Sequence, residues 1–123
     1  MNLVDSSGWL EYLADGRNAH FFVQAIEDTE NLTVSTINIY EVFKRILQQR
    51  NEDAALQAVA LMQQATVIEV TSSISMSAAK LSVEHKLPLA DSLILTTAQL
   101  HNATLWTQDA DFKGFDCVQY IKK

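Results

Sequence analysis

Short apolar segments alternate with helical segments along the whole chain, and this alternation limits the possible folds more than any other feature of the sequence. The strand-like runs are residues 2–5, 32–35, 66–70 and 104–107, with a possible fifth at 117–121. Strands separated by helices are typical of a parallel sheet with right-handed crossovers and helices on both faces. We therefore predict an α/β fold, a three-layer α/β/α sandwich around a short central parallel sheet.

The helices between these strands are predicted from their apolar periodicity and from capping residues at their starts. The predicted ranges are 8–14, 19–28, 36–50, 54–64, 75–86 and 88–100. A chain of 123 residues has room for one hydrophobic core, so we expect a single domain over residues 1–123.

The composition gives evidence on membrane association and on the cellular compartment of the protein. No apolar run reaches the roughly 18 residues that a membrane span needs. The first residues lack the basic and apolar regions of a secretory signal. A single cysteine, Cys117, cannot form an internal disulfide, which fits a reducing compartment. We expect a cytoplasmic protein with no membrane association.

Four acidic residues are predicted to converge at one edge of the sheet. Asp5 ends the first strand, and Asp109 lies just past the fourth. Glu41 is early in the helix after the second strand, and Asp91 is in the first turns of its own helix. In parallel sheets of this kind, ligands bind beyond the carboxyl ends of the strands. These four side chains are therefore candidate site residues.

Asp91 stands in an almost wholly apolar stretch, "KLPLADSLILTTAQL" at residues 86–100. Leu89, Leu93 and Leu100 recur at helical spacing, so we expect this helix to be buried around most of its circumference. A buried carboxylate is costly unless it is paired or bound to metal. At an effective dielectric constant of about 20, two carboxylates about 4 Å apart repel by roughly 4 kcal/mol. Mg²⁺ or Mn²⁺, which prefer hard oxygen ligands, would relieve that repulsion.

Each acid also has a purely structural explanation. Asp5 could help to cap the turn that follows it. Glu41 stands three residues after Asn38, a spacing like that of a capping box. Asp91 could complement a helix N-terminus if Pro88 is the first helical residue. The acids after the fourth strand could cap a short turn. The coincidence of all four at one edge is what favours a site.

Several stretches together resemble the PIN-domain family, and especially the VapC-type toxins of type II toxin–antitoxin pairs. They are "LVDSS", "VSTINIYEVFKRI", "HKLPLADSLILTTAQLHNATLWTQDADF" and the closing "CVQYI". The resemblance spans essentially the whole chain and keeps the order and spacing of the acids. It implies a metal-dependent endoribonuclease that hydrolyses RNA phosphodiester bonds with a metal-activated water.

The resemblance also implies roles for individual residues. The acidic quartet of the family, which holds Mg²⁺ or Mn²⁺ and carries catalysis, corresponds to Asp5, Glu41, Asp91 and Asp109. A further, less uniform acid corresponds to Asp111, and supporting hydroxyls correspond to Ser7 and Thr107. Glu41 would ligate directly or through a water, or act as a base.

The sequence departs from the family pattern at two positions near these motifs. Trp106 occupies a strand position where the family usually has a smaller aliphatic residue, and Ser92 stands where alanine is common. Neither belongs to the quartet, so both bear on substrate preference more than on chemistry.

The partners that the resemblance implies are an RNA substrate, a second copy of the chain in a homodimer, and a cognate antitoxin. The antitoxin would place a segment in or near the active groove. The paired helices at 37–63 are candidates for a partner surface, although they could simply cover the sheet. The net charge of −6 predicts weak intrinsic affinity for RNA. The candidate phosphate contacts are Lys44, Arg45 and Arg50, which follow Glu41, and Lys80, Lys86 and Lys113 elsewhere in the chain. Each could equally be part of a solvated helix face.

Other functions remain open at this point. The main alternative is a catalytically silent PIN-like module that regulates by binding a partner. A phosphoacceptor receiver domain would need an acidic pair after the first strand and a lysine after the fifth, and the chain lacks this arrangement. A haloacid-dehalogenase-like phosphatase needs D-x-D where the chain has Asp5-Ser6-Ser7.

Overall fold

The computed structural model describes residues 1–123 and contains one parallel sheet of five strands. The strands are β1 (Asn2–Val4), β2 (Leu32–Ser35), β3 (Thr66–Ile68), β4 (Thr104–Thr107) and β5 (Val118–Tyr120). Their order across the sheet is β3-β2-β1-β4-β5, and every neighbouring pair is parallel. β2 and β3 are therefore added on one side of β1, and β4 and β5 on the other.

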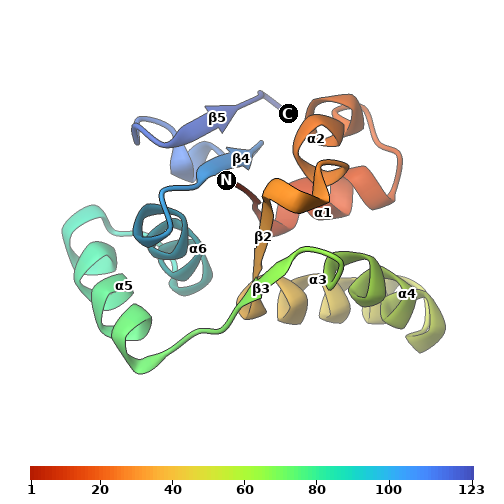
Figure 1. Cartoon of the computed structure of the whole chain (residues 1–123), viewed down its shortest axis with the longest axis horizontal. Helices are drawn as coiled ribbons and strands as arrows, with labels where there is room; N and C mark the ends of the chain where they lie inside the picture. Colours follow the sequence, from red (N-terminus) through yellow and green to blue (C-terminus); the bar gives the residue numbers. More distant parts are fainter.

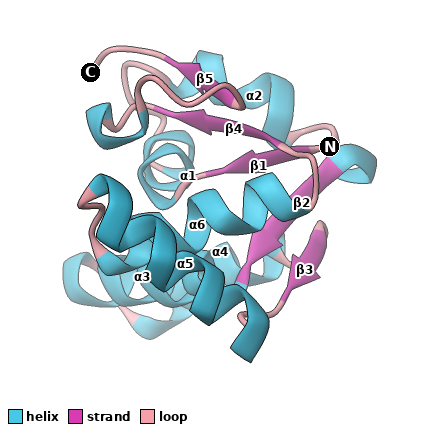
Figure 2. Ribbon diagram, turned by 90° about the vertical axis from the view of Figure 1, so that its left-hand side faces the viewer, coloured by secondary structure: helices cyan, strands magenta, loops and turns pink.

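Six α-helices connect the strands and cover both faces of the sheet (Figures 1 and 2). They are α1 (Ser6–Leu13), α2 (Ala19–Ile26), α3 (Thr36–Gln49), α4 (Glu52–Met62), α5 (Ser72–His85) and α6 (Leu89–Leu100). Two short 3₁₀ turns are η1 (Thr29–Asn31) and η2 (Ala110–Phe112). In Figure 1, α1 and α2 lie on one side of the strands and α5 and α6 on the other. The predicted three-layer α/β/α arrangement is confirmed.

Two hydrophobic cores separate the layers, and β1 contributes to both. Val4 packs with Trp9 and Phe22 beneath α1 and α2, while Leu3 packs with Ile94 beneath α6. Successive strand residues point to opposite faces of a sheet, which explains why the adjacent residues Leu3 and Val4 are both apolar and buried. All of these side chains are at most 1% exposed. β1 is therefore fixed from both sides, and the residue that follows it is positioned rigidly.

The element boundaries differ from the prediction mainly at helix starts. The predicted strand 2–5 ends at Val4, because the Asp5 side chain accepts a hydrogen bond from Gly8 N–H and begins α1. The predicted strand 66–70 ends at Ile68, and α5 begins at Ser72 because Thr71 caps it. The predicted strand 117–121 is shortened to Val118–Tyr120. The serine pairs at 6–7 and 72–73 form the first residues of α1 and α5, each after a capping residue.

The expected burial of α6 around most of its circumference is confirmed for its central turns, but not for the two leucines at its ends. Leu89 is 75% exposed and Leu100 is 55% exposed, whereas every residue from Ser92 to Ala98 is buried. The reason is that α6 lies between the sheet and α5, so its central turns are enclosed on all sides while both ends project. Pro88 is the N-cap residue of α6 and not its first helical residue.

None of the helices combines the length and apolar character that a bilayer-spanning segment requires.

Candidate metal centre

Asp5 is held at the carboxyl end of β1 by a set of hydrogen bonds. Its carboxylate is 2% exposed and accepts from Gly8 N–H at 2.9 Å, from the Ser7 hydroxyl at 2.9 Å, and from the Thr107 hydroxyl at 2.8 Å. Burial raises the pKa of Asp5 to about 6, although these hydrogen bonds act in the opposite direction. The structural prediction that Asp5 caps the following turn is confirmed, and the same contacts fix its orientation.

Glu41 is oriented by a relay of hydrogen bonds that begins on its own helix, α3, and passes through Ser6 of α1. The Asn38 amide donates to the Ser6 hydroxyl at 3.0 Å, and the Ser6 hydroxyl donates to Glu41 Oε1 at 2.6 Å. The capping box at the start of α3 is formed by Ser35 and Asn38, so the suggestion that Glu41 belongs to it was wrong. Glu41 therefore does not cap α3, and it lies near the carboxyl end of β1, where Asp5 and Ser6 line the same cavity. Ser6 and Asn38 were missed by the sequence analysis.

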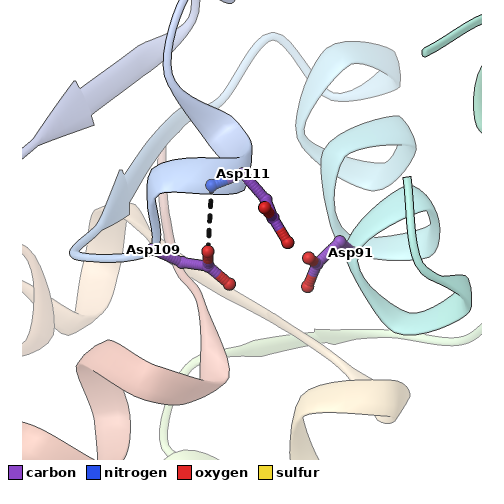
Figure 3. Close-up of side chains that lie close together, drawn as sticks. All are labelled: Asp91, Asp109 and Asp111. Atoms are coloured by element: carbon purple, nitrogen blue, oxygen red, sulfur yellow. Dashed lines mark hydrogen bonds between the residues drawn. The ribbon is translucent and has the colours of Figure 1, made fainter. Parts of the chain in front are cut away.

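Three aspartates from α6 and the segment after β4 form a close cluster (Figure 3). Each of Asp91, Asp109 and Asp111 offers a carboxylate oxygen, and these oxygens lie within 4.8 Å of one another. Asp109 caps η2 by accepting from Asp111 N–H at 2.9 Å, which confirms the predicted cap, and its own N–H donates to the Thr107 hydroxyl at 2.9 Å. Asp91 and Asp111 point toward each other in Figure 3.

The negative charges in this cluster oppose one another. The pKa of Asp91 is raised to about 7, first by burial and then by the Asp109 charge, by hydrogen bonding and charge from Asp111, and by the Asp5 charge. No lysine or arginine forms an ion pair with any of these acids; the one ion pair in the structure joins His85 and Glu84. A cluster of carboxylate oxygens without a protein cation suits a hard divalent ion such as Mg²⁺ or Mn²⁺.

An open cavity of about 310 Å³ brings the four predicted acids together. It is lined by Asp5, Ser6, Ser7, Leu10, Glu41, Arg45, Asp91, Ile94 and Asp109. Asp111 is exposed and does not line this cavity, whereas Asp5 and Glu41 line it but are not part of the close cluster. Asp91 and Asp109 are the two acids common to the cavity and to the close cluster.

The location of the cavity follows from the sheet topology. β1 pairs with β2 on one side and with β4 on the other, so the direction of strand addition reverses between β1 and β4. Such a switch point opens a crevice at the carboxyl ends of the strands. Asp5 is the first residue after β1 and Asp109 the second after β4, which is why residues about a hundred positions apart in sequence share one site.

Comparisons with known proteins agree with this architecture. The family model described as "PIN domain" matches residues 3–116. A chain of a toxin–antitoxin complex from Klebsiella pneumoniae is 25% identical, with 97% of this chain and 96% of that chain covered and a TM-score of 0.82. No curated protein matches the sequence.

Two more distant structures share the fold. One is VapC20 of Mycobacterium tuberculosis, described as a sarcin–ricin loop cleaving toxin: 18% identical, 94% of this chain and 96% of that chain covered, TM-score 0.78. The other is from VapBC2 of Rickettsia felis bound to promoter DNA: 13% identical, 98% and 97% covered, TM-score 0.75. Because the family model matches residues 3–116, nearly the whole chain, the chain belongs to the PIN-domain family.

Proposed function

We propose that this protein is a metal-dependent endoribonuclease and the toxin of a type II toxin–antitoxin pair. The observation that carries the proposal is the cavity in which Asp5, Glu41, Asp91 and Asp109 meet without an ion-pair partner. Membership of the PIN-domain family and the likeness to a toxin–antitoxin complex support it. The RNA-cleaving toxin VapC20, which shares the fold, suggests RNA as the substrate class.

The residues present fit a divalent cation. Asp91 and Asp109, together with Asp5, would hold it, and Asp111 and Glu41 are further oxygen donors nearby. When bound, the ion supplies a Lewis acid that lowers the pKa of a water and offsets negative charge at the scissile phosphate. We assign the site to Mg²⁺ or Mn²⁺ on the hardness of the donors.

The chain's own groups perform the remaining tasks. Glu41 Oε1 accepts a hydrogen bond from Ser6, its second oxygen has no hydrogen-bond partner, and the residue lines the cavity. That oxygen can accept the proton of an attacking water, which makes Glu41 the general base of the proposal. Asp5, fixed by Ser7 and Thr107, holds one side of the site rigid while the substrate binds.

We further propose a cognate antitoxin, a homodimer and a cytoplasmic location. The support for an antitoxin is the likeness to a chain of a toxin–antitoxin complex. The α3–α4 pair, predicted from sequence as a partner surface, lies beside the acidic cavity through Glu41 and Arg45. A partner docked there would cover the site.

The proposal is tested by incubating the purified chain with total RNA in Mn²⁺, in EDTA, and as the Asp109→Asn variant. Cleavage should appear only in the first case, and Asp109→Asn should lower the rate by orders of magnitude. Asp116→Asn is the matched control, because Asp116 is an exposed acid outside the cavity. If the wild type binds a partner protein but cleaves no RNA in Mn²⁺, the silent PIN-like module is the better description.

A further inference from the structure

Gln108 stands between two residues of the metal centre and is almost completely buried. Thr107, which precedes it, donates its hydroxyl to Asp5, and Asp109, a proposed metal ligand, follows it. The Gln108 side chain carries an amide with both donor and acceptor atoms, yet the residue is only 7% exposed. A buried amide of this kind needs hydrogen-bond partners within the protein, and the partners that it has chosen show which segments it connects.

Both ends of the Gln108 amide are hydrogen-bonded, each to a different segment. Its Oε1 accepts from the Asn18 amide at 2.9 Å, and its Nε2 donates to the Ser7 carbonyl oxygen at 3.4 Å, the longer of the two bonds. Ser7 is in the first turn of α1, and Asn18 is the residue before α2. Gln108 therefore joins the segment after β4 to the starts of two helices.

Asn18 supports this contact instead of capping its own helix. Asparagine is among the preferred N-cap residues, but Asn18, at the N-cap of α2, forms no side-chain capping bond. Its amide donates to Gln108 and, at 3.2 Å, to the Lys122 carbonyl oxygen. Its backbone N–H donates to Glu11 Oε2 at 2.8 Å, and the residue is 6% exposed. Asn18 is thus held in place by several bonds while its amide is directed at Gln108.

The residues that Gln108 connects are the ones that hold two of the acids. Ser7, whose carbonyl oxygen accepts from Gln108, donates its hydroxyl to Asp5 at 2.9 Å. On the other side, the N–H of Asp109, the residue after Gln108, donates to the Thr107 hydroxyl at 2.9 Å. The position of Asp109 relative to Asp5 therefore depends on the Gln108 side chain as well as on the Thr107 hydroxyl.

We propose that Gln108, supported by Asn18, is a positioning residue of the metal centre, and that it fixes Asp109 relative to Asp5 so that both bind one divalent ion. Groups that orient metal ligands without touching the ion typically change its affinity about 10–100-fold when they are removed. The inference rests on the proposed metal-dependent function, to which it adds two uncharged residues that are not themselves ligands.

The test replaces the amides by apolar side chains of similar size, so that no charge changes near the ion. Gln108→Met removes both bonds of the bridge and leaves the buried Asn18 amide without Gln108 as its partner. The double variant Asn18→Leu/Gln108→Met removes the polar groups at both ends, and replacing both partners of a hydrogen bond by apolar groups is nearly neutral for stability.

Two control variants separate positioning from stability. Gln49→Met makes the same substitution at an exposed glutamine near the end of α3. Met62→Ala truncates a fully buried residue of α4 outside the acidic cavity, so it destabilises the fold without touching the bridge. Mn²⁺ affinity of each purified chain is measured by calorimetric titration, and the melting temperature is measured by circular dichroism in EDTA.

Gln108→Met should weaken Mn²⁺ binding about tenfold and lower the melting temperature by about 5 °C, because it leaves a buried amide unpaired. The double variant should regain most of the melting temperature but keep the weakened Mn²⁺ binding, because the bond to Ser7 is still missing. Met62→Ala should show the reverse, with a lower melting temperature and unchanged Mn²⁺ affinity. Gln49→Met should match the wild type in both measurements.

The outcomes separate this inference from the nuclease proposal. If Mn²⁺ affinity follows the melting temperature through all the variants, Met62→Ala included, the bridge is only structural and the inference is overturned. Wild-type Mn²⁺ affinity in Gln108→Met would also overturn it, while RNA cleavage by the wild type would leave the nuclease proposal standing. If the variants differ in Mn²⁺ affinity as expected but the wild type cleaves no RNA, the positioning role stands and the nuclease proposal fails. If the wild type binds no Mn²⁺, both are overturned.

Discussion

The hydroxyl of Thr107 donates a 2.8 Å hydrogen bond to Asp5 Oδ2 across the paired ends of β4 and β1. The same hydroxyl accepts from Asp109 N–H at 2.9 Å. One buried side chain therefore connects the two strand ends that carry acids. The arrangement makes the geometry of the site depend on a residue that is not itself an acid.

Replacing this hydroxyl by a methyl group should be costly. Thr107→Val keeps the shape of the side chain but leaves the Asp109 N–H without a partner and removes a donor from buried Asp5. We expect a loss of about 1–3 kcal/mol in the free energy of unfolding, measured by urea denaturation, and weaker Mn²⁺ binding. Thr107→Ser, which keeps the hydroxyl, should recover most of both. Wild-type stability in Thr107→Val would contradict this role.

The stability of the metal-free protein should fall as pH rises. The folded-state pKa values of Asp5 and Asp91 are about 6 and about 7, above the ordinary 3.8, chiefly because both are buried. The folded state then binds more protons than the unfolded state, so this stability is complete below the ordinary pKa and is lost as pH passes through the raised values.

The measurement is a denaturation series in EDTA from about pH 4 to about pH 8, where stability should decline most above about pH 5. Asp91→Asn removes one of the two groups, so its profile should be flatter and the variant should be more stable than wild type at the alkaline end. A wild-type profile that rises toward pH 8, with Asp91→Asn parallel to it, would show that the acids do not repel one another in the folded state.

Ser6 should matter for catalysis through Glu41. Ser6→Ala removes the 2.6 Å hydrogen bond to Glu41 Oε1 and leaves the Asn38 amide without its partner. We expect kcat for RNA cleavage to fall roughly tenfold, with KM changed little, because the base is misoriented while substrate contacts remain. Equal kcat values in Ser6→Ala and wild type, alongside loss of activity in Glu41→Gln, would show that the relay is not needed.

Gly8 should be intolerant of any side chain. A Cβ atom at this position would lie 2.6 Å from Phe22 Cε1 and 2.7 Å from Val4 Cγ1, and both neighbours are fully buried. We expect Gly8→Ala to cost about 1–3 kcal/mol of stability through overpacking. Adding Phe22→Leu opens space at the contact, so the double variant should lose less than the sum of the two single changes. Strict additivity would contradict a direct clash.

Much of this architecture follows from local sequence. The alternation of strands and helices predicts a parallel sheet, and the position of each acid relative to a strand end predicts which edge it reaches. The prediction that Asp5 and Asp109 lie at one edge of the sheet is confirmed, because each stands within two residues of a strand end. The caps at Asp5 and Asp109 could also be predicted from the sequence, because each depends on a residue only two or three positions away.

The features that sequence did not reveal depend on contacts between distant segments. The link from Asn38 through Ser6 to Glu41 joins α3 to the start of α1, and its only local signal is that Asp5 is followed by two serines, Ser6 and Ser7. The exposure of Leu89 and Leu100 depends on where α5 ends against α6. Arg45 is the one cationic residue that lines the acidic cavity, and this could not be predicted because it depends on how α1 packs against α3.

The central claim is that the converging carboxylates hold a divalent cation, and calorimetric titration of Mn²⁺ into the purified, partner-free chain tests it most directly. Asp91→Asn is titrated in parallel, with Asp116→Asn as the control acid outside the cavity. We predict saturable binding to wild type and to Asp116→Asn, and binding at least about tenfold weaker in Asp91→Asn. Equal binding by all three proteins, or none by the wild type, would contradict the assignment of this site.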